Sequence, residues 1–99
     1  MMIEDQRIVA IAKQVANSNL SEQAVEAVVS EPTVDSEGRE ALRITIVIKP
    51  RNVARIKGDA ALDTLFQIQN QLLAEGEERP AIVEYATKKE FEQRGDAKS

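Results

Sequence analysis

The chain has no cysteine and no histidine. The absence of cysteine excludes disulfide bonds, thiolate metal sites and thiol nucleophiles. The absence of histidine removes the usual general base near neutral pH, the commonest zinc ligand and every nucleophile that a histidine activates. We therefore expect a protein that is not an enzyme and that holds no metal and no cofactor.

Aromatic residues are also scarce, since Phe66, Tyr85 and Phe91 are the only ones in a chain that is 42% apolar. The core must therefore be built mainly from isoleucine, leucine, valine and alanine. A chain of 99 residues forms one small core of this kind, which stabilises a fold only modestly. Self-association or a binding partner is an expected additional source of stability.

Long apolar runs are missing as well, and charged residues make up 30% of the chain. Residues 1–14 mix Glu4, Asp5, Arg7 and Lys13 with apolar side chains, which is typical of neither a signal peptide nor a membrane span. We therefore expect a cytoplasmic protein with no membrane segment. The net charge of −4 argues against a protein that coats nucleic acid without selectivity.

A single domain is predicted over residues 1–99, with an ordered core over about 5–92 and a frayed tail over 95–99. Its first element is an amphipathic helix from Asp5 to about Asn17, because apolar residues recur there at the spacing i, i+3, i+4 and i+7. The periodicity of residues 23–30 suits either a helix or a strand. We predict a strand, since a helix would leave only two strands, too few for an independent sheet.

The clearest strand is predicted at residues 41–49, where apolar and mostly polar residues alternate. One face carries Leu42, Ile44, Ile46 and Ile48, and the other carries Arg43, Thr45, Val47 and Lys49. The first face should be buried, whereas the second should be open to water or to a partner. Residues 32–40 contain several turn formers and predict the loop of a β-hairpin that precedes this strand.

A second helix is predicted at residues 60–75, with Asp59 as its N-cap and Gly76 just beyond its C-terminus. Its many apolar residues predict a broad buried face, formed by Ala61, Leu62, Leu65, Phe66, Ile68, Leu72 and Leu73. Its outer face is rich in amide side chains, namely Gln67, Gln69, Asn70 and Gln71. Amides suit solvent, and they also suit a polar interface.

A third strand is predicted at residues 81–86, where Ile82, Val83 and Tyr85 indicate burial on both faces and therefore neighbours on both sides. Thr87, followed by Glu90, has the spacing of a capping box and predicts a short terminal helix. Phe91 should reach back from this helix to the domain.

The predicted order is therefore α-β-β-α-β-α. It specifies an α+β fold with a three-stranded mixed sheet, formed by a hairpin and a β-α-β crossover, with helices on one face.

Charged residues gather in three places, and each has a structural interpretation beside a functional one. The segment 49–57 contains the cations Lys49, Arg51, Arg55 and Lys57 and no acid, so it suits a phosphate backbone as well as solvent. Asp35, Glu37 and Glu40 lack the spacing of a calcium loop and are expected to serve a turn. The glutamates Glu75, Glu77, Glu78 and Glu84 are expected to be solvated rather than catalytic.

The element order over about residues 5–86 resembles the type II KH fold and the KH-like ribosome-binding factor A family. This resemblance implies an RNA-binding role. KH domains clamp the nucleic-acid backbone with a GxxG loop, whereas Lys57-Gly58-Asp59 supplies one glycine beside an acid that repels phosphate. RNA binding through Lys49, Arg51, Arg55 and Lys57 is therefore the alternative hypothesis.

The segments ALRITIVIK, GDAALDTL and EGEERPAIVEYAT, within residues 41–87, are similar to segments of short bacterial α/β proteins of no assigned activity. Proteins of that kind are sometimes associated with a neighbouring HEPN-type or toxin-like gene. The resemblance therefore implies a role in binding a protein partner.

The main functional hypothesis is a small, non-catalytic interaction or regulatory module. It would act as the antitoxin-like partner of a two-protein system or as a homodimer. The polar side of the second predicted strand and the amides of the second helix supply the candidate contacts, which are Arg43, Thr45, Lys49, Gln67 and Asn70.

Overall fold

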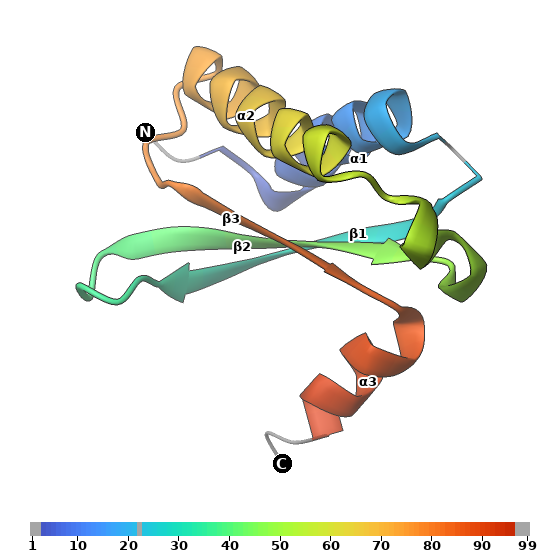
Figure 1. Cartoon of the computed structure of the whole chain (residues 1–99). Helices are drawn as coiled ribbons and strands as arrows, with labels where there is room; N and C mark the ends of the chain where they lie inside the picture. The colour runs from blue at the N-terminus through green and yellow to red at the C-terminus, as the bar shows by residue number, and fades with distance from the viewer. Residues whose placement is uncertain (1–2, 22, 97–99) are drawn as a thin grey trace.

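The computed structural model describes residues 3–21 and 23–96 of the chain. In chain order, the elements within these ranges are α1 (Asp5–Leu20), β1 (Val25–Val34), β2 (Glu40–Ile48), the 3₁₀ helix η1 (Pro50–Arg55), α2 (Gly58–Ala74), β3 (Ala81–Ala86) and α3 (Lys88–Asp96). This order and the three-stranded mixed sheet confirm the predicted α+β fold (Figure 1). α3 extends to Asp96, and the rest of the predicted tail, residues 97–99, lies outside the described residues.

β2 is the central strand, with β1 antiparallel on one side and β3 parallel on the other. α1 and α2 lie side by side over one face of this sheet (Figure 1). The core lies between the two layers, and it is aliphatic as predicted. Its main buried members are Ile8, Ile11 and Val15 of α1, Leu42, Ile44, Ile46 and Ile48 of β2, and Ile68 and Leu72 of α2.

α3 lies on the opposite side of the sheet from α1 and α2 (Figure 1). Its Phe91 lines a groove of about 440 Å³ together with Val29 and Val47, which belong to the sheet face turned away from the other helices. Phe91 therefore returns to the domain as predicted. The helices that cover the core are α1 and α2 alone among the described elements.

The capping box at the start of α3 is confirmed. The backbone N–H of Glu90 donates to Thr87 Oγ1 at 3.2 Å, and the backbone N–H of Thr87 donates to Glu90 Oε1 at 2.9 Å. Two backbone donors at the helix N-terminus are thereby satisfied. The bond from the backbone N–H of Thr87, together with a bond of 3.0 Å that the Thr87 hydroxyl donates to Glu90 Oε1, lowers the pKa of Glu90 below its ordinary value.

Thr87→Ala should therefore loosen α3 while leaving the rest of the domain folded. Losing the capping oxygen typically costs a helix about 1 kcal/mol. The Cα chemical shifts of residues 88–93 should move toward random-coil values in this variant. Thr87→Ser keeps the hydroxyl and is the matched control, and an equal change in the two variants would contradict a capping role.

The hairpin loop is shorter than expected, because β1 extends through Pro32 to Val34. Asp35 closes the turn, since its Oδ1 accepts the backbone N–H groups of Glu37 and Arg39, both at 2.9 Å. Gly38 follows with a φ of +83°, a conformation that favours glycine. The predicted structural role of the acid at the start of this turn is therefore confirmed.

α2 begins earlier than expected, so the prediction that Asp59 caps it is wrong. Lys57, in extended conformation, occupies the N-cap position, and Asp59 lies in the first turn. A carboxylate in the first turn still interacts favourably with the helix dipole. An acid at this place therefore marks the start of the helix without being its N-cap. Gly76 follows the C-cap with a φ of +94°, as predicted.

Two predictions of burial are wrong, and they concern neighbouring elements. α2 buries a narrower face than expected, because Leu62, Phe66 and Leu73 are exposed. β3 is an edge strand rather than a flanked one, and Ile82 is exposed. Both errors have one physical cause: the sheet ends at β3, so nothing within the described chain covers what lies beyond it.

Candidate functional site

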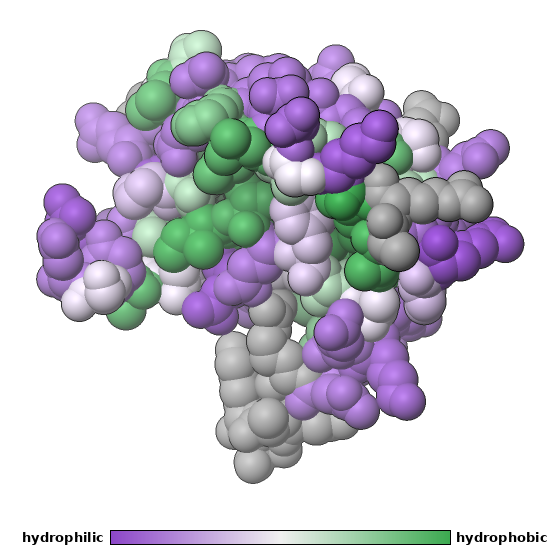
Figure 2. Space-filling view, in the orientation of Figure 1, coloured by the Kyte–Doolittle hydropathy of each residue, from purple (hydrophilic) through white to green (hydrophobic). Residues whose placement is uncertain are grey.

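α2 carries an exposed apolar stripe, formed by Leu62, Phe66 and Leu73. The exposed fractions of these residues are 52%, 56% and 54%, respectively. Their spacing of i, i+4 and i+11 places them on one side of the helix, since each turn takes 3.6 residues. Figure 2 shows apolar atoms gathered over α2 and β3 on the side that faces the viewer.

The stripe lies on the side of α2 that is turned away from α1. On one flank, Gln67 Oε1 accepts a hydrogen bond from Asn19 Nδ2 of α1 at 3.2 Å. Gln69, within the stripe, accepts the backbone N–H of Ala81 in β3 at 2.9 Å. The stripe therefore runs along the free edge of β3.

The free edge of β3 presents unpaired backbone groups. Peptide groups alternate in direction along a strand, and the carbonyl of Pro80 accepts the N–H of Leu42 in β2. The N–H and C=O groups of Ala81, Val83 and Tyr85 consequently point away from β2. Gln69 satisfies the N–H of Ala81, whereas the described residues offer no partner to those of Val83 and Tyr85.

We call this surface the α2–β3 edge and define it by Leu62, Phe66 and Leu73 of α2 together with the free backbone of Val83 and Tyr85 of β3. It combines apolar side chains with the donors and acceptors of an open strand. Both are groups that a second protein chain can cover.

The other edge of the sheet, at β1, differs from that at β3. Its strand contains Pro32, an irregularity in register between Val25 and Ala27, and the charged residues Glu26 and Glu31. Proline, bulges and charges are the usual means by which proteins protect an edge from pairing. β3 contains no proline and no bulge over Ala81–Ala86, and its charged residue, Glu84, is paired with Arg43 of β2. The unprotected edge is therefore the one beside the apolar stripe.

The structure does not bring the predicted contact residues together. Arg43 and Thr45 point to the sheet face opposite α2, since they alternate with the core residues of β2, and Lys49 directly follows that strand. Gln67 and Asn70 lie on α2, across the sheet. The five residues therefore form no single surface.

The polar face of β2 is also less accessible than its sequence suggests. Thr45 is fully buried, and Arg43 Nε lies 3.5 Å from Glu84 Oε1 of β3. β2 is the central strand, so side chains of β1 and β3 flank this face. α3 lies over part of it as well. Alternation along one strand shows which residues share a face, but it does not show what the neighbouring strands place over them.

The basic segment 49–57 adopts η1 and leads into α2. Among the described side chains, those of Lys49, Arg51 and Lys57 have no carboxylate within ion-pair distance, and the side chain of Arg55 lies outside the described part. Phe66, Tyr85 and Phe91 belong to other elements, so η1 itself supplies no aromatic ring for base stacking.

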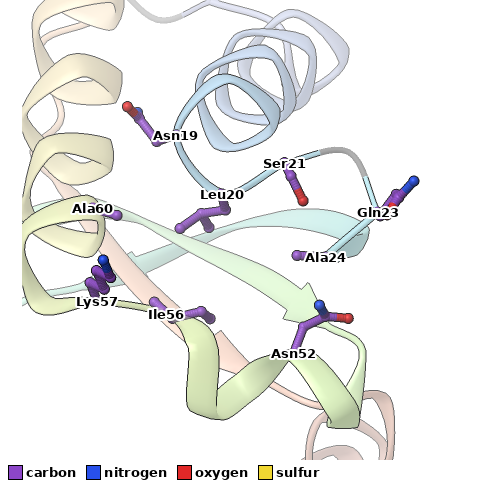
Figure 3. Close-up of a pocket in the computed structure, with 9 residues that line it drawn as sticks. All are labelled: Asn19, Leu20, Ser21, Gln23, Ala24, Asn52, Ile56, Lys57 and Ala60. Carbon is purple, nitrogen blue, oxygen red and sulfur yellow. The ribbon is translucent and has the colours of Figure 1, made fainter.

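A pocket of about 330 Å³ lies beside this segment (Figure 3). Its lining comes from the end of α1, the connection between α1 and β1, η1 with the residues that follow it, and the start of α2. Among the described residues of the lining, Lys57 is the one that carries a charge, and the amide of Gln23 points away from the others (Figure 3). Among the described residues, the buried side-chain atoms that lack a hydrogen-bond partner are Ser30 Oγ and Arg43 Nε, and neither residue lines this pocket.

Glu77 corrects the prediction that the glutamates near the end of α2 are solvated. Its side chain is fully buried, and its carboxylate accepts four hydrogen bonds, two from the side chain of Arg79 at 2.9 and 3.0 Å and one each from the backbone N–H groups of Arg79 and Ile3 at 3.0 Å. The hydrogen bonds from Arg79, above all, lower the pKa of Glu77 to about 2. This carboxylate therefore ties the segment before α1 to the connection between α2 and β3.

No cluster of three or more acidic side chains suited to a metal ion occurs in residues 3–21 and 23–96. Within the same ranges, no helix has the length and apolar character needed to cross a membrane.

Searches of family models, of curated proteins and of solved structures find no significant match to this chain. The resemblances to KH-like proteins and to short bacterial proteins therefore stay predictions.

Proposed function

We propose that this chain is a non-catalytic protein-interaction module that associates through the α2–β3 edge. The observation that carries the proposal is the position of three exposed apolar side chains beside an unpaired strand edge. An exposed apolar residue by itself is ordinary, and so is an edge strand. Their juxtaposition offers a partner both apolar area and backbone hydrogen bonds, which is how strand addition to a sheet gains affinity.

The shifted pKa values support a structural rather than a catalytic use of the acids. Arg79 lowers the pKa of Glu77, and Arg7 lowers that of Glu75 through an ion pair between α1 and the end of α2. Backbone hydrogen bonds from the hairpin turn lower the pKa of Asp35. A general acid or base needs its pKa moved toward neutrality, and these shifts go in the opposite direction.

RNA binding through the segment 49–57 has weaker support. Its cations Lys49, Arg51 and Lys57 are available for phosphate, but a GxxG loop is missing from the sequence and η1 supplies no aromatic side chain. The two functions differ in their response to salt. RNA binding should weaken steeply as salt rises, because bound cations release counterions from the nucleic acid. Association through an apolar edge should not.

The test is size exclusion coupled to light scattering, run on the protein alone and after co-expression with the product of the adjacent gene. Phe66→Glu places a charge in the stripe, where it should abolish association. Gln71→Glu adds the same charge on an exposed residue five positions further along α2, about 140° around the helix from Phe66, and should have no effect. A monomer in every wild-type run, or equal effects of the two substitutions, would contradict the proposal.

A further inference from the structure

The α2–β3 edge is suited to a partner that presents the same two features. We propose that this partner is a second copy of the chain, bound by antiparallel pairing of β3 with β3 of the second copy about a two-fold axis perpendicular to the sheet. This inference rests on the proposed function and specifies its partner.

The strand geometry supports self-pairing. Val83 and Tyr85 each present one N–H and one C=O at the free edge, so two copies of β3 related by a two-fold axis can exchange hydrogen bonds reciprocally. The three-stranded sheet then becomes a continuous six-stranded one with the order β1-β2-β3-β3-β2-β1. The unprotected edges disappear, and the edges that remain are those of β1, which carry Pro32 and the irregular register.

The helix layer supports the same arrangement. An axis perpendicular to the sheet keeps both α2 helices on one face, and each stripe lies on the β3 side of its helix, as the bond from Ala81 to Gln69 shows. The stripes of the two copies therefore face each other. Leu62, Phe66 and Leu73 carry no charge, so their approach buries apolar surface without opposing like charges within the stripe.

The size of the surface indicates a dimer of moderate affinity. α2 has 17 residues and is about 25 Å long. A helix packed on a strand is roughly 20 Å deep with its side chains, which gives about 500 Å² on each copy and about 1,000 Å² in total. This total is close to the lower limit for a specific interface, so the dimer should dissociate on dilution.

The dimer also explains why sequence patterning predicted more burial than one chain provides. The apolar residues of α2 predict a broad buried face, and those of β3 predict neighbours on both sides. In a single copy, Leu62, Phe66 and Leu73 are exposed and β3 has one neighbour. A second copy supplies the missing helix and the missing strand together. Sequence and structure disagree where a partner is absent, as expected of a functional surface.

Sedimentation velocity of the purified protein, over a hundredfold range of concentration, tests this proposal. The wild type should shift from monomer to dimer. Phe66→Glu should raise the dissociation constant by at least roughly 100-fold, since the two-fold axis places the charge in the interface twice. Gln71→Glu should leave the dissociation constant unchanged.

The strand contact needs a variant of its own. In Val83→Pro the lost N–H points away from β2, so the sheet within the chain keeps its ladder while the edge loses a donor. Val83→Ala removes packing without removing the donor and is the matched control. Val83→Pro should weaken the dimer at least tenfold relative to Val83→Ala.

Higher salt should strengthen the wild-type dimer, because each copy carries a net charge of −4.

Each pattern of results decides between the inference and the function on which it rests. A dimer that responds to Phe66→Glu and to Val83→Pro supports both. A dimer that is insensitive to Val83→Pro relative to Val83→Ala overturns strand pairing. A monomer that binds the adjacent gene product, with loss of binding in Phe66→Glu, overturns self-association but supports the interaction module. A wild type that is monomeric in every condition overturns both.

Discussion

Glu77→Gln should lower the free energy of unfolding by about 3 kcal/mol at neutral pH, a large share of the roughly 5–15 kcal/mol typical of a domain. The substitution keeps the size of the side chain but removes the charge that accepts hydrogen bonds from Arg79 and Ile3. The guanidinium of Arg79, which is mostly buried, is then left without its counter-charge. Urea unfolding followed by circular dichroism measures the loss.

The same contact predicts a pH dependence of known sign. The pKa of Glu77 is about 2 in the folded protein against an ordinary value of 4.5, so the folded state favours the ionised form. Its contribution to stability is therefore fully present above pH 4.5 and is lost as the pH falls from 4.5 toward 2.

The difference in stability between the wild type and Glu77→Gln should accordingly shrink over that interval. The same change at exposed Glu92, on α3, should have little effect at any pH. A difference that stays constant down to pH 2 would show that Glu77 is not held ionised by its partners.

Leu72→Ala and Leu73→Ala should separate folding from association, because the two adjacent leucines differ in burial. Leu72 is fully buried in the core, and Leu73 is 54% exposed in the stripe. Truncating a buried leucine usually costs about 2–5 kcal/mol of stability. Truncating one at an exposed site usually changes stability by about 0.5 kcal/mol or less.

Chemical denaturation at low protein concentration, where the monomer dominates, measures the first effect, and sedimentation velocity measures the second. Leu72→Ala should lose stability. Leu73→Ala should keep its stability as a monomer but form a weaker dimer. Equal losses of stability in the two variants would mean that Leu73 is part of the core, and no change in association would remove it from the α2–β3 edge.

Local patterns were sufficient to predict most elements of the fold, whereas residues 23–30 were assigned to a strand only because two strands are too few for an independent sheet. Strict alternation over residues 41–49 predicted the strand β2 and its buried face, which holds Leu42, Ile44 and Ile46, but not the central position of that strand. The capping box at Thr87 and the glycine at position 76 were correctly assigned, because each depends on residues close together in sequence. Such features need no knowledge of tertiary neighbours.

The features that sequence analysis missed depend on which elements are neighbours in space. Glu77 belongs to a linker rich in acids, and its burial becomes visible only when Ile3 is placed against it. Gln69 was one of four similar amides, and its bond to Ala81 depends on how α2 sits over β3. Arg43 and Thr45 share a face, but the flanking strands cover much of it.

One signal for the α2–β3 edge was nevertheless present in the sequence. α2 has more apolar residues than one side of a helix needs, and β3 has the pattern of a strand between two neighbours. A sheet with only three strands has only one interior strand, which β2 occupies. The chain thus has more apolar residues on α2 and β3 than a three-stranded sheet with one layer of helices can bury. This excess is the observation that could have pointed to the α2–β3 edge.

Amide hydrogen exchange along β3, measured by NMR at low and at high protein concentration, shows whether a second copy pairs with the free edge of this strand. The N–H groups of Ile82 and Glu84 point toward β2 and those of Val83 and Tyr85 toward the free edge, so one strand contains both the probe and its control. In a β3–β3 dimer, exchange at Val83 and Tyr85 should slow as the concentration rises, and Phe66→Glu should abolish this change while Ile82 and Glu84 stay protected throughout. Exchange at Val83 and Tyr85 that stays fast at every concentration would contradict this pairing.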